Sequence, residues 1–239
     1  MGIRRGSIST PIIVDGLVFN MDAANRASYP RTGTTATDTV GNLTGSLTNG
    51  TAFSDTNEGI FVLDGSDDYI DCGNGSSIDN LAQNGFTSNA WINADTLGDS
   101  NTGRILNKRY NNSGWILFMD SANTIGAQIL ATSVIANSRG ADNQLSLSSW
   151  TYVTMTYDYY GADRKIRLYV NGVEISYETQ TTTTSQASDD SLGSLLIGED
   201  FNLDRSFNGK IANTQIYNRT LSATEVLHNY NALKPRFGL

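Results

Sequence analysis

The sequence predicts an all-β protein built from short antiparallel strands, with one helix near its C-terminus. Between residues 151 and 175, apolar and polar side chains alternate in two runs joined by a glycine turn, and this period of two is typical of strands with one buried face. The 239 residues include 23 Gly and 3 Pro among many Thr, Ser and Asn, as expected for short strands separated by turns. A chain of this length and pattern fits one domain with a sizeable core.

Runs of apolar residues between Gly and Asn clusters give the order of the expected strands. These runs are 17–22, 59–64, 68–72, 86–94, 104–108, 114–119, 124–130, 152–159, 165–170, 173–175, 194–198 and 207–219. Alternate residues of 166–170 should line the core, and Asn171-Gly172 is the pattern of a type I′ hairpin turn. Residues 86–94 alternate without indicating which face is buried. The Thr-rich segment 177–191 lacks apolar alternation, which predicts an exposed loop or an edge strand.

A capping box predicts the start of the helix. Ser222 and Glu225 have the spacing at which the Ser oxygen accepts the Glu amide proton while the Glu side chain returns to the Ser amide. Four apolar residues then recur at helical spacing: Val226, Leu227, Tyr230 and Leu233. This stripe should pack on the sheets.

Both ends of the chain are candidates for attachment to a partner. The expected division is an extended N-terminal arm, a single domain and a C-terminal tail: residues 1–14, 15–234 and 235–239. The arm carries Arg4 and Arg5, so it is either a disordered tail or a device that docks on a negatively charged partner. The tail is expected to expose Phe237 unless a partner covers it.

The central hairpin also carries a family resemblance. Its pattern is a Trp, then V-x-x-T-Y-D, a Gly turn and L-Y-V-N-G, carried by Trp150, Val153, Thr156, Tyr157, Asp158, Gly161, Leu168, Tyr169, Val170, Asn171 and Gly172. This pattern resembles the laminin-G-like jelly-roll domains of the concanavalin A-like lectin/glucanase superfamily. The resemblance implies a two-sheet antiparallel concanavalin A-like jelly-roll sandwich with the short C-terminal helix. It supplies no function, since one fold hosts many functions.

Further blocks narrow the resemblance. Residues 16–50, 61–73 and 217–239 are similar to laminin-G-like domains in structural proteins of tailed bacteriophages, marine ones especially. Similar blocks also occur in bacterial surface proteins. Together with the central hairpin, these blocks cover most of the chain and imply a virion protein.

Charge and hydropathy argue against several classes of function. The chain has 24 acidic and 16 basic residues, and its net charge of −8 argues against a general nucleic-acid binder. No apolar run reaches the length of a membrane span, and the N-terminal residues do not have the pattern of a secretory signal peptide. Cys72 is the single cysteine, so no internal disulfide can form, and its strand pattern predicts a small buried hydrophobic residue.

The superfamily includes glucanases, so catalysis has to be weighed. A glycosidase needs two carboxylates that flank the scissile bond, and the glucanase members carry them as Glu-x-Asp-x-x-Glu on one strand. The five glutamates do not fit that spacing: Glu58, Glu174, Glu178, Glu199 and Glu225. The one histidine, His228, is expected as a solvated residue of the terminal helix. We therefore expect no enzymatic activity and no cofactor.

A calcium site near residues 64–68 is the candidate metal centre. Asp64, Asp67 and Asp68 lie within five positions around a turn, and Ca²⁺ takes six to eight oxygen ligands. Relatives in the superfamily often carry a calcium. The other interpretation is that the Asp side chains cap the backbone of the turn, and it is favoured because residues 211–214 lack the acids of the family's Ile-Asp-Glu-Val-type run. We expect no metal.

Two functions from different classes follow. The first is a non-enzymatic virion structural protein on the exterior of a phage capsid or tail, which is made in the host cytoplasm, contacts other virion proteins such as the major capsid protein, and self-associates as a homo-oligomer. The alternative is a lectin-like adhesion module for host-surface glycans, with Tyr110, Tyr159 and Tyr160 in loops as stacking rings. Neither function involves nucleic acid or a membrane.

Overall fold

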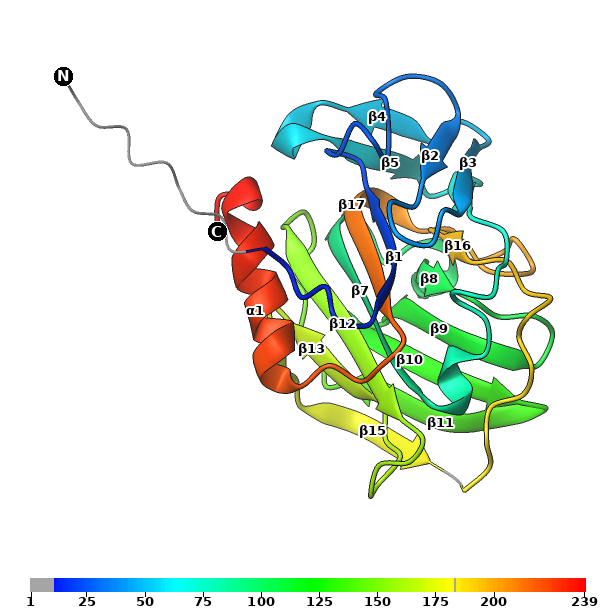
Figure 1. Cartoon of the computed structure of the whole chain (residues 1–239). Helices are drawn as coiled ribbons and strands as arrows, with labels where there is room; N and C mark the ends of the chain where they lie inside the picture. Colours follow the sequence, from blue (N-terminus) through cyan, green and yellow to red (C-terminus); the bar gives the residue numbers. More distant parts are fainter. Residues whose placement is uncertain (1–10, 183) are drawn as a thin grey trace.

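Two antiparallel sheets packed face to face form the protein, and a single α-helix lies on the outside (Figure 1). The computed structural model describes residues 11–182 and 184–239. Sheet A runs β14 (Val173–Glu174), β13 (Arg167–Val170), β12 (Thr151–Asp158), β7 (Gly85–Ala94), β17 (Asn208–Tyr217), β5 (Ile60–Asp64) and β4 (Ala52–Ser54), and β1 (Leu17–Asp22) pairs with β17. The predicted all-β sandwich with a C-terminal helix is confirmed.

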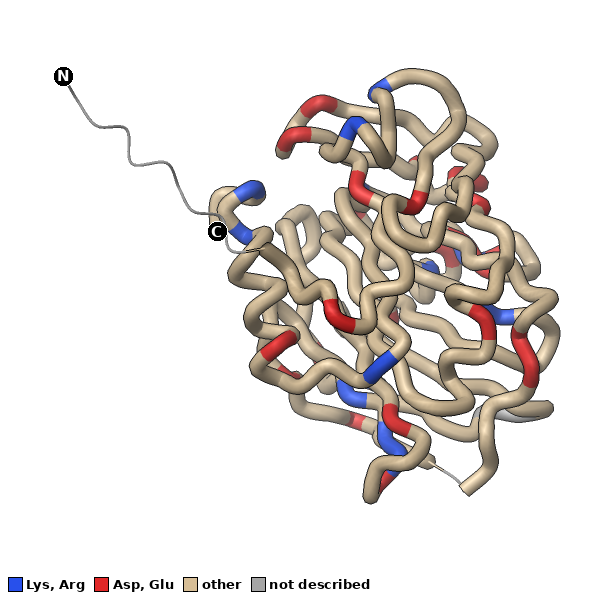
Figure 2. The backbone as a smooth tube through the Cα atoms, in the orientation of Figure 1, with Lys and Arg blue, Asp and Glu red and all other residues tan. Residues whose placement is uncertain are grey.

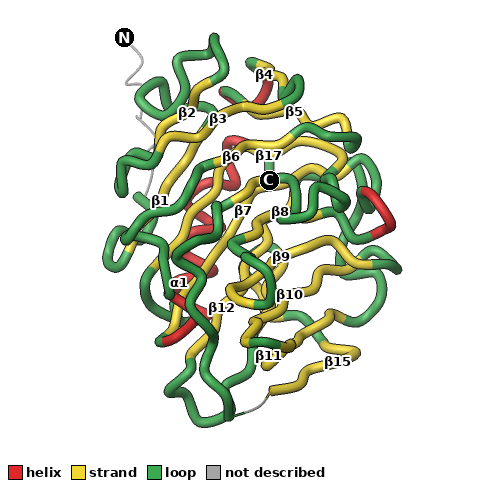
Figure 3. Tube along the Cα trace, turned by 90° about the vertical axis from the view of Figure 1, so that its right-hand side faces the viewer, coloured by secondary structure: helices red, strands yellow, loops and turns green. Residues whose placement is uncertain are grey.

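Sheet B lies opposite sheet A. Its order is β15 (Tyr177–Thr182), β11 (Ser133–Gly140), β10 (Thr124–Ala131), β9 (Ser113–Asp120), β8 (Arg104–Asn107), β16 (Leu196–Ile197), β6 (Tyr69–Asp71), β3 (Thr44–Thr48) and β2 (Thr35–Thr37). Figure 3 shows the succession from β8 to β15 from the side. The Thr-rich segment supplies β15 at the edge of this sheet, which is where a strand without apolar alternation can stay half-solvated.

Alternation along the central strands builds the core between the sheets. Phe86, Ala90 and Ile92 of β7 point inward together with Val153 and Met155 of β12, and all five are buried. Each strand contributes every second residue, as a period of two requires. The expected core residues of the central hairpin are confirmed for Ile166 and Leu168, which are fully buried, whereas Val170 is half-buried and packs against the core.

The hairpin turn between β13 and β14 has the geometry that its sequence predicts. Asn171 and Gly172 have φ values of 51° and 81°, and a type I′ turn needs positive φ at both central positions. Val170 and Val173 pair across the turn. A side chain at Gly172 would collide with Leu227 of the helix, so this position needs glycine for packing as well as for its backbone angle.

Helix α1 (Ala223–Leu233) and the 3₁₀ turn η4 (Lys234–Phe237) cover the outer face of sheet A. Trp91 of β7 is fully buried beneath them. Both faces of this strand are therefore buried, although its alternation alone did not indicate which face would be. The capping box of Ser222 and Glu225 is present as expected. The predicted apolar stripe of the helix was wrong at one position, since Leu227 is 40% exposed. The polar residue Asn229 is buried and faces the sheet instead.

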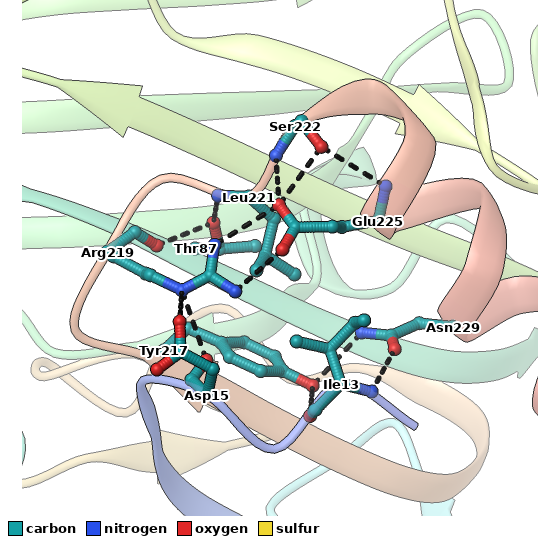
Figure 4. A network of polar contacts seen from close by, with 9 residues as sticks. All are labelled: Ile13, Asp15, Thr87, Tyr217, Arg219, Leu221, Ser222, Glu225 and Asn229. Carbon is teal, nitrogen blue, oxygen red and sulfur yellow. Dashed lines mark hydrogen bonds and ion pairs between the residues drawn. The ribbon is translucent and has the colours of Figure 1, made fainter. Parts of the chain in front are cut away.

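A polar network holds the helix and residues 13–15 against sheet A (Figure 4). The Ile13 amide donates to Asn229 Oδ1 at 2.8 Å, and Tyr217 Oη donates to the Ile13 carbonyl at 2.9 Å. Arg219 contacts both oxygens of Glu225, at 2.7 and 3.1 Å. The described end of the predicted arm, residues 11–14, is thus fastened to the domain, whereas Arg4 and Arg5 lie outside the described residues.

The expectation that Phe237 is exposed was wrong. This ring is 8% exposed and stacks on Trp91 with centroids 4.1 Å apart, while Trp150 lies 4.5 Å away on a tilted plane. Arg236 fastens the same turn by bonding to Asp22 and to the carbonyls of residues 57 and 59. The tail therefore covers the domain's own aromatic residues, and Phe237 is not a surface for a partner in this arrangement. Neither α1 nor any other described helix is both long and apolar enough to span a bilayer.

Candidate functional site

A cavity of about 300 Å³ beside Tyr110 is the first candidate site. We call it the Tyr110 pocket, and its lining residues are Tyr110, Asn111, Asn112, Ser113, Thr132, Ser188 and Asp189. The loop between β8 and β9 forms one wall, because Tyr110 and Ser113 exchange backbone hydrogen bonds of 3.1 and 3.0 Å across a tight turn. Ser188 and Asp189 form the opposite wall from a segment that is distant in sequence.

A buried lysine fixes these two walls relative to each other. Lys108 is fully buried, and its Nζ donates to the carbonyls of Asp190 and Gly193 at 2.7 Å each. The same ammonium pairs with carboxylates of Asp79 and Asp190 at 3.0 and 3.6 Å. Buried charges persist when they are paired and hydrogen-bonded, as here. The Tyr110 pocket is therefore preorganised rather than formed by free loops.

Close packing also holds the Tyr110 ring. A methyl group at Gly193 would lie 3.0 Å from Tyr110 Cβ, so only a glycine lets the two loops approach this closely. The Phe201 ring meets Tyr110 edge-on, with centroids 5.4 Å apart. Phe201 sits on a loop anchored by the buried Glu199, which accepts from Asp200 N, Arg205 N and Ser206 Oγ.

The pocket combines an aromatic ring with free amide and carboxylate groups. The side chains of Asn111 and Asn112 are exposed and make no hydrogen bond among the described residues. Asp189 accepts the Ser191 amide at 2.9 Å, and this bond lowers the pKa of the carboxyl, which keeps it ionised. The set offers donors, acceptors and an apolar face at once.

A second cavity, of about 270 Å³, opens beside the loop between β12 and β13. We call it the Lys165 pocket, and it is lined by Thr156, Asp158, Gly161, Ala162, Asp163, Lys165, Arg167 and Thr220. Along this loop, two acidic positions, Asp158 and Asp163, are followed by basic ones, and Figure 2 shows acidic and basic segments close together there. Arg167 forms ion pairs with Asp163 at 2.8 Å and with Glu174 at 3.3 Å, whereas Lys165 makes no ion pair among the described residues.

Tyr159 and Tyr160 follow Asp158 in the chain, but neither lines the Lys165 pocket. Their rings meet edge-on with centroids 5.1 Å apart, and the Arg164 guanidinium lies 4.7 Å from the Tyr159 centroid. Tyr160 is 72% exposed, so its face is open to a ligand. Of the three tyrosines proposed from sequence, Tyr110 thus lines a pocket, whereas Tyr159 and Tyr160 line neither of the two.

Sequence analysis missed most of the groups that surround these rings. Lys108 and Asp189 enter through contacts between distant segments, and no local pattern identifies them. The Asn111-Asn112 pair is visible in the sequence as a turn, but a turn of this type is common between strands. Lys165 lies in a run of alternating polar and apolar residues, where the sequence predicts only a solvated strand position.

The three carboxylates of the 64–68 turn do come together. Their ligand atoms lie within 4.8 Å of one another, so their oxygens could hold a cation. Two of them also cap the turn, since Asp68 accepts the Asp64 amide and Asp64 accepts the Ser66 amide. An acid from elsewhere, Glu199, is linked to this turn through Ser206, whose hydroxyl contacts both Glu199 and the Ser66 carbonyl, whereas residues 211–214 carry no acid. Two of the three carboxylates therefore already accept hydrogen bonds from backbone amides of the turn, as the capping interpretation expects.

A sequence model of the family described as "Concanavalin A-like lectin/glucanases superfamily" matches residues 64–227. The chain belongs to this family. Among curated protein sequences, none matches the chain. The family assignment agrees with the sandwich and with the resemblance of the central hairpin.

Several solved structures that share this fold are binding domains of toxins. The binding domain of Paraclostridial Mosquitocidal Protein 1 is 17% identical with a TM-score of 0.68, and the match covers 90% of this chain and 52% of that one. The receptor binding domain of botulinum neurotoxin C/D mosaic serotype is 18% identical with a TM-score of 0.68, covering 90% and 51%. The binding domain of botulinum neurotoxin DC in complex with SialylT is 16% identical with a TM-score of 0.68, covering 92% and 52%. The chain thus spans about half the length of these structures, and at this identity the likeness concerns the fold.

Proposed function

We propose that this chain is a non-enzymatic carbohydrate-binding module and that the Tyr110 pocket is its binding site. The observation that carries the proposal is a cavity of about 300 Å³ in which an aromatic ring, two free amides and an ionised carboxylate converge between walls held by a buried lysine. Small-molecule sites of this kind are concave and largely preformed, with a few convergent polar groups.

The chemistry of the pocket suits sugar hydroxyls. Each hydroxyl donates one hydrogen bond and accepts others, so neighbouring hydroxyls can bond to a carboxylate and an amide together. Asp189 supplies acceptors, Asn111 and Asn112 supply both kinds of group, and the Tyr110 ring offers an apolar face for the C–H side of a sugar.

Carbohydrate binding also agrees with the relatives in structure. One neighbouring binding domain was solved in complex with SialylT, and another structure, which concerns botulinum neurotoxin type C, describes cell entry that depends on two ganglioside molecules. These statements concern those toxins. They support the proposal because this chain shares its fold with about half of each of those binding domains.

Catalysis is not part of the proposal. Asp189 is the one acidic residue that lines the Tyr110 pocket among the described residues, whereas a glycosidase needs two carboxyl groups. Glu199 and Glu225 are engaged in loop anchoring and helix capping, and Glu174 pairs with Arg167. These three glutamates thus serve structure.

A glycan microarray followed by calorimetry tests the proposal. We expect the wild-type protein to bind at least one glycan class and Tyr110→Ala to lose that binding by tenfold or more, which corresponds to about 1.4 kcal/mol. Tyr69→Ala, which removes a half-buried tyrosine outside both pockets, is the matched control and should bind as wild type. Absence of glycan binding, or unchanged binding by Tyr110→Ala, would overturn the proposal.

A second role, on the exterior of a phage capsid or tail, stays a prediction that rests on the sequence resemblance. One arrangement favours it: residues 11–14 and η4 both pack beside α1 on sheet A, while the Tyr110 pocket lies in loops of sheet B. Attachment to other virion proteins, such as the major capsid protein, or to a second copy of the chain would then leave the pocket free for host glycans. Quantitative mass spectrometry of density-purified particles tests this role, and absence of the chain from particles would refute it.

A further inference from the structure

We propose that the Tyr110 pocket prefers a sugar that carries a free amino group, whose ammonium binds to Asp189 and to the Tyr110 ring. This inference rests on the proposed function of the pocket and adds the class of sugar. Three features of the described residues carry it: the charge of the lining, its supply of hydrogen-bond acceptors and the aromatic ring.

Asp189 gives the pocket its charge. The other six described residues of the lining are uncharged. The Asp189 side chain is exposed and makes no ion pair among the described residues, since the donors that hold it belong to the neutral residues Ser191 and Asn80. An ionised carboxylate of this kind can take a cation from a ligand, and charge-assisted hydrogen bonds are roughly twice as strong as neutral ones.

The two basic residues that precede Tyr110 in the chain are engaged elsewhere. The Lys108 ammonium is fully buried and gives its donors to two carbonyls and to the Asp79 carboxylate. Arg109 donates through Nε to the Asn111 carbonyl at 2.7 Å and does not line the cavity. The described lining therefore offers an acidic sugar no positive group, whereas it offers an ammonium an unpaired carboxylate.

Two hydroxyl groups of the lining present lone pairs rather than protons. Ser113 Oγ donates to the Tyr110 carbonyl at 2.8 Å, and Thr132 Oγ1 donates to the Ala131 carbonyl at 2.6 Å. A hydroxyl has one proton, so each of these oxygens can only accept a further hydrogen bond. An ammonium has three donors and no acceptor, and it therefore suits this lining better than a hydroxyl, which brings lone pairs of its own.

The Tyr110 ring adds a surface that attracts cations. The face of an aromatic ring carries negative potential, and an ammonium within about 6 Å of its centroid is stabilised by it. Tyr110 lines the cavity and is partly exposed, and its contacts with Phe201 and Gly193 hold it in place before a ligand arrives. Binding therefore does not have to order this side chain.

The charge of the whole protein acts in the same direction. Its net charge of −8 attracts a cationic sugar and repels an acidic one at long range. Inside the pocket, the carboxylate of an acidic sugar would lie near Asp189 without a cation between them. The pocket should therefore discriminate against sialic and uronic acids.

Titration with matched monosaccharides tests this inference. The probes are glucose, galactose and mannose, each with a hydroxyl, an acetamide or a free amine at carbon 2, together with sialic acid. Calorimetry or NMR titration at about pH 6 keeps the sugar amine protonated and Asp189 ionised. For at least one of the three sugars, we expect the amine form to bind roughly five- to tenfold tighter than the other two forms, and sialic acid to bind more weakly than all of them.

Two positions and the salt concentration identify the source of this preference. Asp189→Asn removes the charge at nearly constant shape and should reduce the preference for the amine to less than about twofold. Tyr110→Phe keeps the aromatic face and should keep the preference, whereas Tyr110→Leu should lower it. Raising the salt from about 0.1 to about 1 M shortens the Debye length from about 10 to about 3 Å, and it should weaken the binding of the amine form selectively.

Asp99→Asn is the matched control. It also removes one exposed carboxylate without an ion pair among the described residues, but Asp99 lies outside both pockets, so the preference should stay as in wild type. Equal binding of the amine and acetamide forms, binding confined to glycans without an amino group, tightest binding of sialic acid, or an unchanged preference in Asp189→Asn would refute the inference and leave the proposed function standing. If no probe binds and the glycan microarray is also blank, the proposed function fails together with it.

Discussion

Replacing Lys108 by Ala is expected to destabilise the protein by about 3–5 kcal/mol. The structure explains the size of this effect, because the Lys108 ammonium is fully buried and bonds to two carbonyls and two carboxylates. Its removal would leave Asp190, which is 1% exposed, as a buried charge without its main partner. Breaking a buried pair from one side costs more than the pair contributes, since the remaining charge stays desolvated.

The pH dependence of this variant gives a second observable. Burial raises the pKa of Asp190 and Lys108 partly opposes that rise, so removal of the lysine should raise the pKa further. A carboxyl whose pKa is higher in the folded than in the unfolded state favours folding at low pH and opposes it as the pH rises through this window. The stability difference between wild type and Lys108→Ala should therefore shrink as the pH falls below neutrality toward the ordinary pKa of Asp.

Urea denaturation monitored by tryptophan fluorescence measures both effects. Lys210→Ala is the matched control, because Lys210 pairs with Asp95 at 2.6 Å at a partly exposed position and should cost under about 1 kcal/mol. The Lys108→Ala, Asp190→Asn double variant should be less destabilised than the sum of the single variants, since the two residues interact directly. A loss below about 1 kcal/mol for Lys108→Ala would refute the buried-anchor interpretation of the Tyr110 pocket.

Three further predictions concern stability. Phe237→Ala should cost about 3 kcal/mol in urea denaturation, because it uncovers the Trp91 face; a change within about 0.5 kcal/mol would contradict this packing. Glu225→Gln should cost about 1 kcal/mol at neutral pH, and since the hydrogen bond from Arg219 lowers the pKa of Glu225 to about 2, the cost should fade as the pH drops from 4.5 toward 2 in a pH series of melts. A calcium chelator should leave the melting temperature unchanged because the Asp64–Asp68 turn is capped by its own backbone bonds; a drop of several degrees would mean that a bound cation supports the turn.

The strands and the helix follow from local rules, which is why they could be predicted. The alternation around Val153 and Leu168 and the Asn171-Gly172 turn each act over a few residues, and the Ser222 capping box acts over four. Which face of β7 is buried could not be predicted, because α1 arrives from far along the chain and buries the second face as well.

The candidate site could be predicted in part. Tyr110 and Tyr160 were expected in exposed loops as stacking rings; Tyr110 lines a cavity, whereas Tyr160 is exposed but lines neither pocket. Phe237 was expected at the surface because a terminal aromatic residue after Pro235 has no local partner, yet tertiary packing supplies two aromatic rings, Trp91 and Trp150, and an anchoring arginine. Local sequence carries no record of such contacts.

The sequence by itself determined the fold class, the order of the main strands and the position of the helix, since alternation, turn residues and capping depend on neighbours in the chain. It also determined the family, through the pattern from Trp150 to Gly172. The tertiary structure alone decided that Lys108 would join two distant loops into a preformed pocket. Such contacts join residues separated by about eighty positions, and burial, rather than local propensity, selects them.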